Sequence, residues 1–146
     1  MNIKAGVLSG LAATIVLSIL MMAKAKMGVM PELNAIKMLA GMMSAPMAMG
    51  WVAHFMIGTI VWGTLFAVLV DKLPGGVMSS AILFSIGAWL MMMIGPMPMA
   101  GAGLFGLNIG MMAPIATLML HIIWGIVLGF SYAKLARGPA GATSTT

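Results

Sequence analysis

The two histidines of the sequence, His54 and His121, lie at matching places in two similar stretches of the chain. Each is followed four residues later by a glycine, Gly58 or Gly125. Because residues four apart share one face of a helix, each imidazole would have an open surface beside it. Histidine is a standard axial ligand of haem iron, and an ionisable side chain inside a membrane span is itself a functional hypothesis. If the histidines face each other, they could bind one b-type haem.

Two other interpretations of the histidines stay open. They could serve another metal or a proton pathway. Alternatively, each could hydrogen-bond a neighbouring helix, with Gly58 and Gly125 allowing close helix packing.

The methionines are the second candidate site. The chain has 20 of them, and most fall in two windows, 21–49 and 91–112. Thioethers are soft ligands that suit Cu(I). The residues that the spacing favours as a metal site are the pair around Pro98 and two Met-Met pairs: Met97, Met99, Met42, Met43, Met111 and Met112. Methionine is also an adaptable apolar filler, so plastic packing or a partner-binding surface is the alternative.

The sequence lacks the residues that most enzyme mechanisms need. The only carboxylates, Glu32 and Asp71, lie at the boundaries of apolar stretches, so neither a buried proton relay nor paired-carboxylate hydrolysis is supported. There is no cysteine, which excludes disulfides, Fe–S clusters and c-type haem attachment. No base is identifiable near the serines, and no phosphate-binding loop appears. We expect no catalytic residues and a non-enzymatic role.

The composition is that of a polytopic membrane protein. Hydrophobic residues make up 62% of the chain and charged residues 6%, whereas soluble domains carry roughly 25% charged residues. The net charge of +5 comes from Lys and Arg that flank apolar runs, as membrane topology requires. A nucleic-acid partner is therefore not expected.

The long apolar runs predict an all-α fold with four transmembrane helices. We expect the second helix to begin between Pro46 and Trp51, and the first to be retained because it is longer than a signal-peptide core. The expected spans are Ala5–Ala23, a second ending at Val70, Val77–Ile94 and Met111–Phe130. The turn Asp71–Gly76 should make the second and third spans antiparallel neighbours.

Two connecting segments complete the predicted domain. Residues 27–49 predict a short amphipathic helix with Pro31 in its first turn, lying at the interface or re-entering the membrane. Its apolar face would carry Leu33, Ile36, Ala40 and Met43. The uncharged, glycine-rich residues 99–110 predict a loop packed on the bundle or dipping into it.

An internal repeat relates the two halves. Five similarities recur in the same order at offsets of 67 to 70 residues, among them the Gly-Met-Met boxes at Gly41 and Gly110. They predict two tandem helical hairpins, residues 1–70 and 75–137, followed by a disordered polar tail at 138–146. Parallel repeats are related by an axis along the membrane normal. His54 and His121 should therefore lie at similar depth.

The topology and the small residues suggest where partners would bind. Four spans put both termini on one side, and a slight excess of Lys and Arg there favours the cytoplasm. The lipid bilayer is the expected environment. Two small-residue faces, Gly125/Gly129 and Thr59/Gly63/Ala67, predict contact with a second copy or with a larger membrane complex.

In its length, its four spans and its Lys-flanked first span, the chain resembles small bacterial inner-membrane proteins assigned to domains of unknown function. The resemblance implies a multi-pass protein of the bacterial inner membrane. We expect a metal- or haem-binding protein or an accessory subunit of a larger complex, with haem b or Cu(I) as possible cofactors. The alternative is a carrier or channel for a small neutral solute, acting as a homodimer.

Overall fold

A computed structural model describes residues 1–137, and the regular structure in that range is entirely helical. The polar tail expected at 138–146 lies outside the described residues. Four helical segments are long and apolar enough to cross a membrane, which confirms the predicted spans. They are α1 (Ile3–Lys26), the composite α3–η1–α4 (Met47–Leu69), α5 with its extension α6 (Val77–Met99), and α7 (Ala113–Ala136).

The second span is not one regular α-helix. It begins as α3 (Met47–Met56), widens into a π-helical turn, η1 (Ile57–Val61), and ends as α4 (Trp62–Leu69). A π turn inserts residues into an α-helix and often marks a functional site. Here it begins three residues after His54 and contains Gly58, which is buried against α1.

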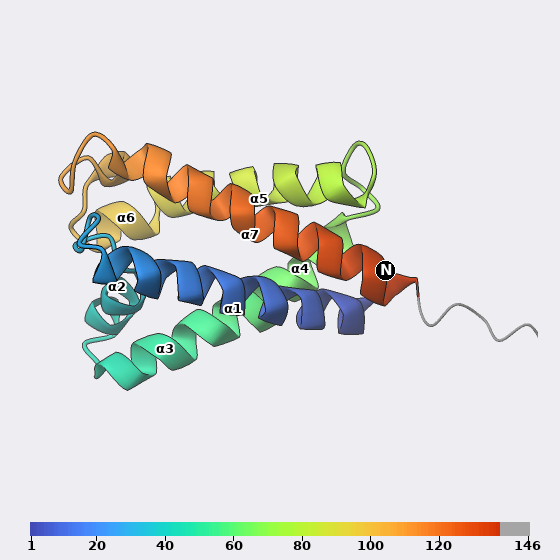
Figure 1. The fold of residues 1–146 in the computed structure, drawn as a ribbon, viewed down its shortest axis with the longest axis horizontal. Coiled ribbons are helices and arrows are strands. Elements are labelled where there is room, and N and C mark those ends of the chain that lie inside the picture. Colours follow the sequence, from blue (N-terminus) through green and yellow to red (C-terminus); the bar gives the residue numbers. More distant parts are fainter. Residues whose placement is uncertain (138–146) are drawn as a thin grey trace, which may run out of the picture.

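Helix α1 lies between the two halves of the bundle. It packs against α3, η1 and α4 on one side and against α7 on the other, while α5 packs against α7 (Figure 1). The N-terminus and the Asp71–Gly76 turn lie at the same end, where the Met1 ammonium nitrogen is 3.3 Å from Asp71 Oδ2. The neighbouring helices therefore run antiparallel, as the short turn predicted.

An aromatic layer fills the bundle toward the end that carries the N-terminus. It consists of Trp62, Phe66, Phe84, Trp124 and Tyr132, and the centroids of the rings in contact are 5.2–6.3 Å apart. Phe66 has no exposed surface. Small residues on α1 let the helices close around this layer.

The two small-residue faces predicted to form a dimer contact pack against other helices of the same chain. A Cβ on Gly63 would lie 2.6 Å from the Gly6 carbonyl oxygen of α1, and one on Gly129 would lie 2.8 Å from Cβ of Ala81 on α5. Gly125 and Ala67 are also buried against these neighbours. This corrects the expectation that these faces are free to contact a second copy, because small residues allow close approach within one bundle equally well.

The first connecting segment forms the predicted amphipathic helix, α2 (Ala35–Met42). Its apolar face buries Ile36 and Ala40, whereas Met43 at its C-terminal end is exposed. Pro31 lies outside it, contrary to expectation, because Asn34 is the N-cap and its side chain accepts a hydrogen bond from the Lys37 amide.

The loop that precedes α2 is bound to α1 through the ammonium group of Lys24. Lys24 Nζ lies 3.0, 2.7 and 2.9 Å from the carbonyl oxygens of Val29, Met30 and Leu33. These contacts satisfy backbone acceptors that would otherwise need water.

The second connecting segment contains α6 (Pro96–Met99) and a short 3₁₀ turn, η2 (Leu104–Gly106). Gly101, Gly103 and Gly106 have φ angles of 78°, 76° and 71°. L side chains rarely adopt these angles, which explains the glycine-rich sequence of this packed loop.

Candidate ligand-binding cavity

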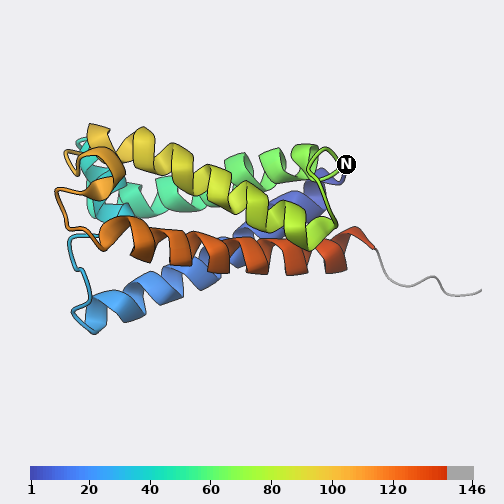
Figure 2. The same cartoon turned by 90° about the horizontal axis from the view of Figure 1, so that it is seen from above.

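A cavity of about 830 Å³ opens between the helices at the end opposite the N-terminus. There α1 diverges from α7 (Figures 1 and 2), and α2 and α6 lie at the same end of the bundle (Figure 1). The walls come from α1, α3, η1, α5 and α7, and the cover comes from α2, α6 and the residues next to them. The aromatic layer borders the cavity through Trp62 and Trp124, which line it.

Few of the lining side chains are polar. They are Thr14, Glu32, Asn34, Lys37, His54, Thr117 and His121. Glu32 and Lys37 are exposed and lie with Asn34 on the covering segment. The histidines and threonines belong to the membrane-spanning walls. The remaining lining is aliphatic, aromatic or thioether.

His54 is held by a short hydrogen-bond chain to α1. Its Nε2 lies 3.1 Å from Ser18 Oγ, and Ser18 Oγ donates to the carbonyl oxygen of Thr14 at 2.7 Å. Because the single hydroxyl hydrogen of Ser18 is used on this carbonyl, Ser18 must accept from His54. The neutral ring therefore carries its proton on Nε2 and a lone pair on Nδ1. No local pattern of residues indicates this pairing, because Ser18 lies on another helix.

His121 is held within its own helix. Its Nδ1 lies 2.8 Å from the carbonyl oxygen of Thr117. A carbonyl oxygen only accepts, so Nδ1 carries the proton and Nε2 has the lone pair. Thr117 is itself fixed, since its hydroxyl lies 2.7 Å from the Ala113 carbonyl oxygen and accepts from Trp89 Nε1 at 3.0 Å.

The two imidazoles thus line one cavity, and each has one nitrogen committed to the protein. The other nitrogen, Nδ1 of His54 or Nε2 of His121, has no hydrogen-bond partner among residues 1–137. His54 lies seven positions after Met47, where α3 begins, and His121 eight positions after Ala113, where α7 begins. At 1.5 Å per residue, both lie about 11–12 Å along their helices.

The glycines beside the histidines pack against hydroxyl side chains. A Cβ on Gly58 would meet the side chain of Thr14, and one on Gly125 would lie 2.7 Å from Cβ of Ser85. Gly58 lines the cavity, whereas Gly125 faces α5. Close helix packing accounts for both, and the open surface expected beside each histidine is occupied by its neighbour.

The six methionines predicted as metal ligands divide into two groups. Met42, Met97 and Met99 line the cavity. The others are exposed and do not line it: Met43, Met111 and Met112. Four lining methionines were missed: Met21, Met38, Met91 and Met92. Met38 and Met42 lie four residues apart on α2, a spacing that puts them on one face and could have indicated this pair.

The donors around the cavity restrict its chemistry. Within residues 1–137, no group of three or more His, Cys, Asp or Glu side chains could hold a metal ion. Hard divalent cations, which prefer several oxygen ligands, therefore find no site of that kind there. Apart from Glu32 and Asn34 on the covering segment and the two threonine hydroxyls, the lining groups that could ligate a metal are imidazole nitrogens and thioether sulfurs.

The chain belongs to a family of unknown function (DUF6789), whose model matches residues 1–143. This agrees with the resemblance to uncharacterised families seen in the sequence. No curated protein and no solved structure matches the chain.

Proposed function

We propose that this protein is a non-enzymatic membrane protein that binds an apolar, planar molecule in the cavity between α1, η1, α5 and α7. One observation carries the proposal: His54 and His121 line the same cavity, and each presents a lone-pair nitrogen while its other nitrogen is bound to the protein. Hydrogen bonds that fix the tautomer and orientation of a histidine are typical of metal and ligand sites.

The size and lining of the cavity support this proposal. Small-molecule sites have volumes of roughly 300–1,000 Å³ and are mostly apolar and aromatic, with a few placed polar groups. The cavity, at about 830 Å³, falls in this range, and Trp62 and Trp124, which line it together with the histidines, supply flat aromatic surface. Its walls lie in membrane-spanning segments, so an apolar ligand could enter from the bilayer.

Haem b is the cofactor that these donors favour. His121 Nε2, the imidazole nitrogen farther from the backbone, would be the axial ligand of the iron. His54 presents Nδ1, which adjoins the ring carbon bearing Cβ, so a macrocycle bound there would crowd the His54 backbone. We therefore propose that one histidine, His121, would hold the iron, and that His54 would only border the macrocycle. Lys37 on the cover could pair with a propionate.

Haem reconstitution of the purified protein tests the proposal. We expect a reduced-minus-oxidised spectrum with b-type absorbance, abolished in His121→Ala and retained with weaker binding in His54→Ala. Met119→Ala is the matched control, because Met119 is 61% exposed on the same helix. Helical circular dichroism establishes that each variant is folded. Absence of b-type absorbance in the folded wild type, or its full retention in His121→Ala, overturns haem as the ligand.

A second assay tests the cavity independently of haem. A lipid-soluble naphthoquinone should quench the fluorescence of the tryptophans that line the cavity, and Leu120→Phe, which narrows it without adding a tryptophan, should weaken that quenching. Equal quenching in both proteins would contradict binding in this cavity.

A carrier for a small neutral solute is the second candidate function. It is favoured by the aromatic layer around Phe66 and Phe84, which lies beyond the inner end of the cavity. Liposome swelling with glycerol tests it. Faster swelling than in empty liposomes, increased further by Phe84→Ala, would support transport; swelling at the rate of empty liposomes would rule it out for glycerol.

We also propose that the chain is a tandem repeat of two hairpins. In each half, a glycine four residues after the histidine packs against a hydroxyl residue of the preceding span: Gly58 on Thr14, and Gly125 on Ser85. These equivalent contacts support the duplication inferred from the offsets.

The proposed location is the bacterial inner membrane, with both termini in the cytoplasm. Basic residues support this orientation, four at the terminal end and three at the other: Lys4, Lys72, Lys134 and Arg137 against Lys24, Lys26 and Lys37. A reporter fused after Arg137 tests this orientation. A reporter found outside the cytoplasm would show that the protein has the opposite orientation.

A further inference from the structure

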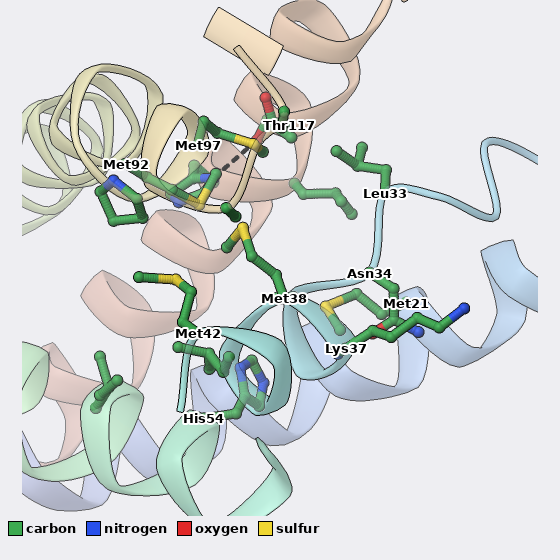
Figure 3. A pocket seen from close by; sticks show the side chains of 18 of the residues that line it. Met21, Leu33, Asn34, Lys37, Met38, Met42, His54, Met92, Met97 and Thr117 are labelled. Atoms are coloured by element: carbon green, nitrogen blue, oxygen red, sulfur yellow. Dashed lines mark hydrogen bonds between the residues drawn. The ribbon is translucent and has the colours of Figure 1, made fainter. Parts of the chain in front are cut away.

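Methionines gather at the covered end of the cavity. Seven line it, and they come from four helices: Met21, Met38, Met42, Met91, Met92, Met97 and Met99. Figure 3 shows the side chains of Met38 and Met42 extending from α2 toward those of Met92 and Met97, with His54 on the same side as Met42. Residues distant in the sequence therefore present sulfur atoms to one space.

Packing explains some methionines of the chain and leaves others unexplained. Packing explains Met93, which has no exposed surface and has its sulfur 3.7 Å from Thr117 Oγ1. Met97 is 3% exposed in the same cluster, but it also lines the cavity. Met38 and Met92 are only partly buried at the edge of that cluster, and Met42 is 39% exposed. The last three have side-chain surface that the fold leaves open to the cavity.

The chemistry of these donors selects one kind of metal ion. Thioether sulfur and neutral imidazole nitrogen are soft or borderline ligands without charge, which suit Cu(I). A monovalent ion is also less costly to transfer into a low-dielectric site than a divalent one, because the solvation energy grows with the square of the charge. The one carboxylate that lines the cavity, Glu32, is exposed on the covering segment.

We infer that Met38, Met42, Met92 and Met97, together with Nδ1 of His54, form a Cu(I)-binding site under the α2 cover. The inference rests on the cavity being a binding site, as proposed above, and is independent of haem. The thioethers supply the soft ligands, and the hydrogen bond from His54 Nε2 to Ser18 leaves Nδ1 available for the metal.

Anaerobic Cu(I) titration against the competing chelator bicinchoninate tests the inference. The test variant replaces four ligands: Met38→Leu, Met42→Leu, Met92→Leu and Met97→Leu. Leucine nearly conserves volume, so the fold should survive, and a thermal melt checks this. The matched control replaces three methionines outside the cavity by leucine: Met43→Leu, Met111→Leu and Met112→Leu.

We expect the wild type and the control to compete equally for one Cu(I). The four-fold variant should bind at least roughly 10–100-fold more weakly, the loss that even indirect changes at metal sites produce. His54→Ala should also weaken binding, whereas His121→Ala should not. Equal affinity in the wild type and the folded four-fold variant overturns the inference. The His121→Ala result separates this site from haem, which requires His121.

Discussion

His54 Nε2 lies 3.1 Å from Ser18 Oγ, and this contact connects the second membrane span to the first beside the cavity. His54 is 8% exposed and Ser18 is 4% exposed, so water cannot readily replace either partner. The bond also sets the tautomer of His54, because Ser18 donates its own hydrogen to Thr14. Ser18 thus determines which nitrogen faces a ligand.

Replacing Ser18 by alanine should destabilise the protein by about 1–3 kcal/mol, because the buried His54 N–H loses its acceptor. Thermal unfolding in detergent measures the effect. Ser79→Ala, at an exposed serine of α5, is the control and should change the melting temperature little. Equal melting of both variants would show that the His54–Ser18 bond adds no stability.

Gly63→Ala should loosen the packing of α4 on α1. Its Cβ would lie 2.6 Å from the Gly6 carbonyl oxygen and 3.1 Å from Val7 Cα, so the backbones must separate. Overpacking of this kind costs about 1–3 kcal/mol. Gly87→Ala is the control, since a Cβ there meets nothing within 4 Å, and it should be neutral or stabilising. An unchanged melting temperature for Gly63→Ala would contradict this packing.

Phe66→Ala should remove the side chain at the centre of the aromatic layer. The side chain is fully buried against Phe84 and Tyr132, and a Phe→Ala change in a core costs about 3–5 kcal/mol. Phe130→Ala removes the same atoms from a side chain that is 54% exposed and should have little effect. Denaturant unfolding of both variants measures the difference, and similar losses would place Phe66 outside the core.

Lys24→Met should release the loop before α2. The variant loses the hydrogen bonds to the carbonyl groups of Val29, Met30 and Leu33, so amide exchange in residues 28–34 should accelerate. Lys26→Met is the control, because Lys26 is exposed at the same helix end. Hydrogen exchange read by mass spectrometry distinguishes them. Unchanged exchange in Lys24→Met would mean that Lys24 does not hold this loop.

Much of the architecture could be predicted from local sequence. Long apolar runs predicted the four spans, because a bilayer requires helices of about 20 residues. Leu33, Ile36 and Ala40 were predicted to share an apolar face and are buried. The Asp71–Gly76 turn joins antiparallel helices because it is too short for any other arrangement. Each of these features depends on residues close together in the chain.

The candidate site was predictable only in part. Both histidines and three of six proposed methionines line one cavity, but the cavity itself depends on the divergence of α1 from α7. Gly125 and the Gly129 face were expected at a ligand or a dimer contact and instead pack on α5. A small-residue face shows that a backbone approaches closely, and it does not say which backbone.

The amino-acid sequence by itself determined the membrane environment, the number of spans and the scarcity of catalytic groups, since these follow from composition and from apolar runs along the chain. Only the tertiary structure decided which nitrogen of His54 is free and which methionines share a space with it. Those relationships join Ser18, Met38 and Met92 to His54 across four helices. They depend on how the helices cross and diverge, which no local pattern of residues specifies.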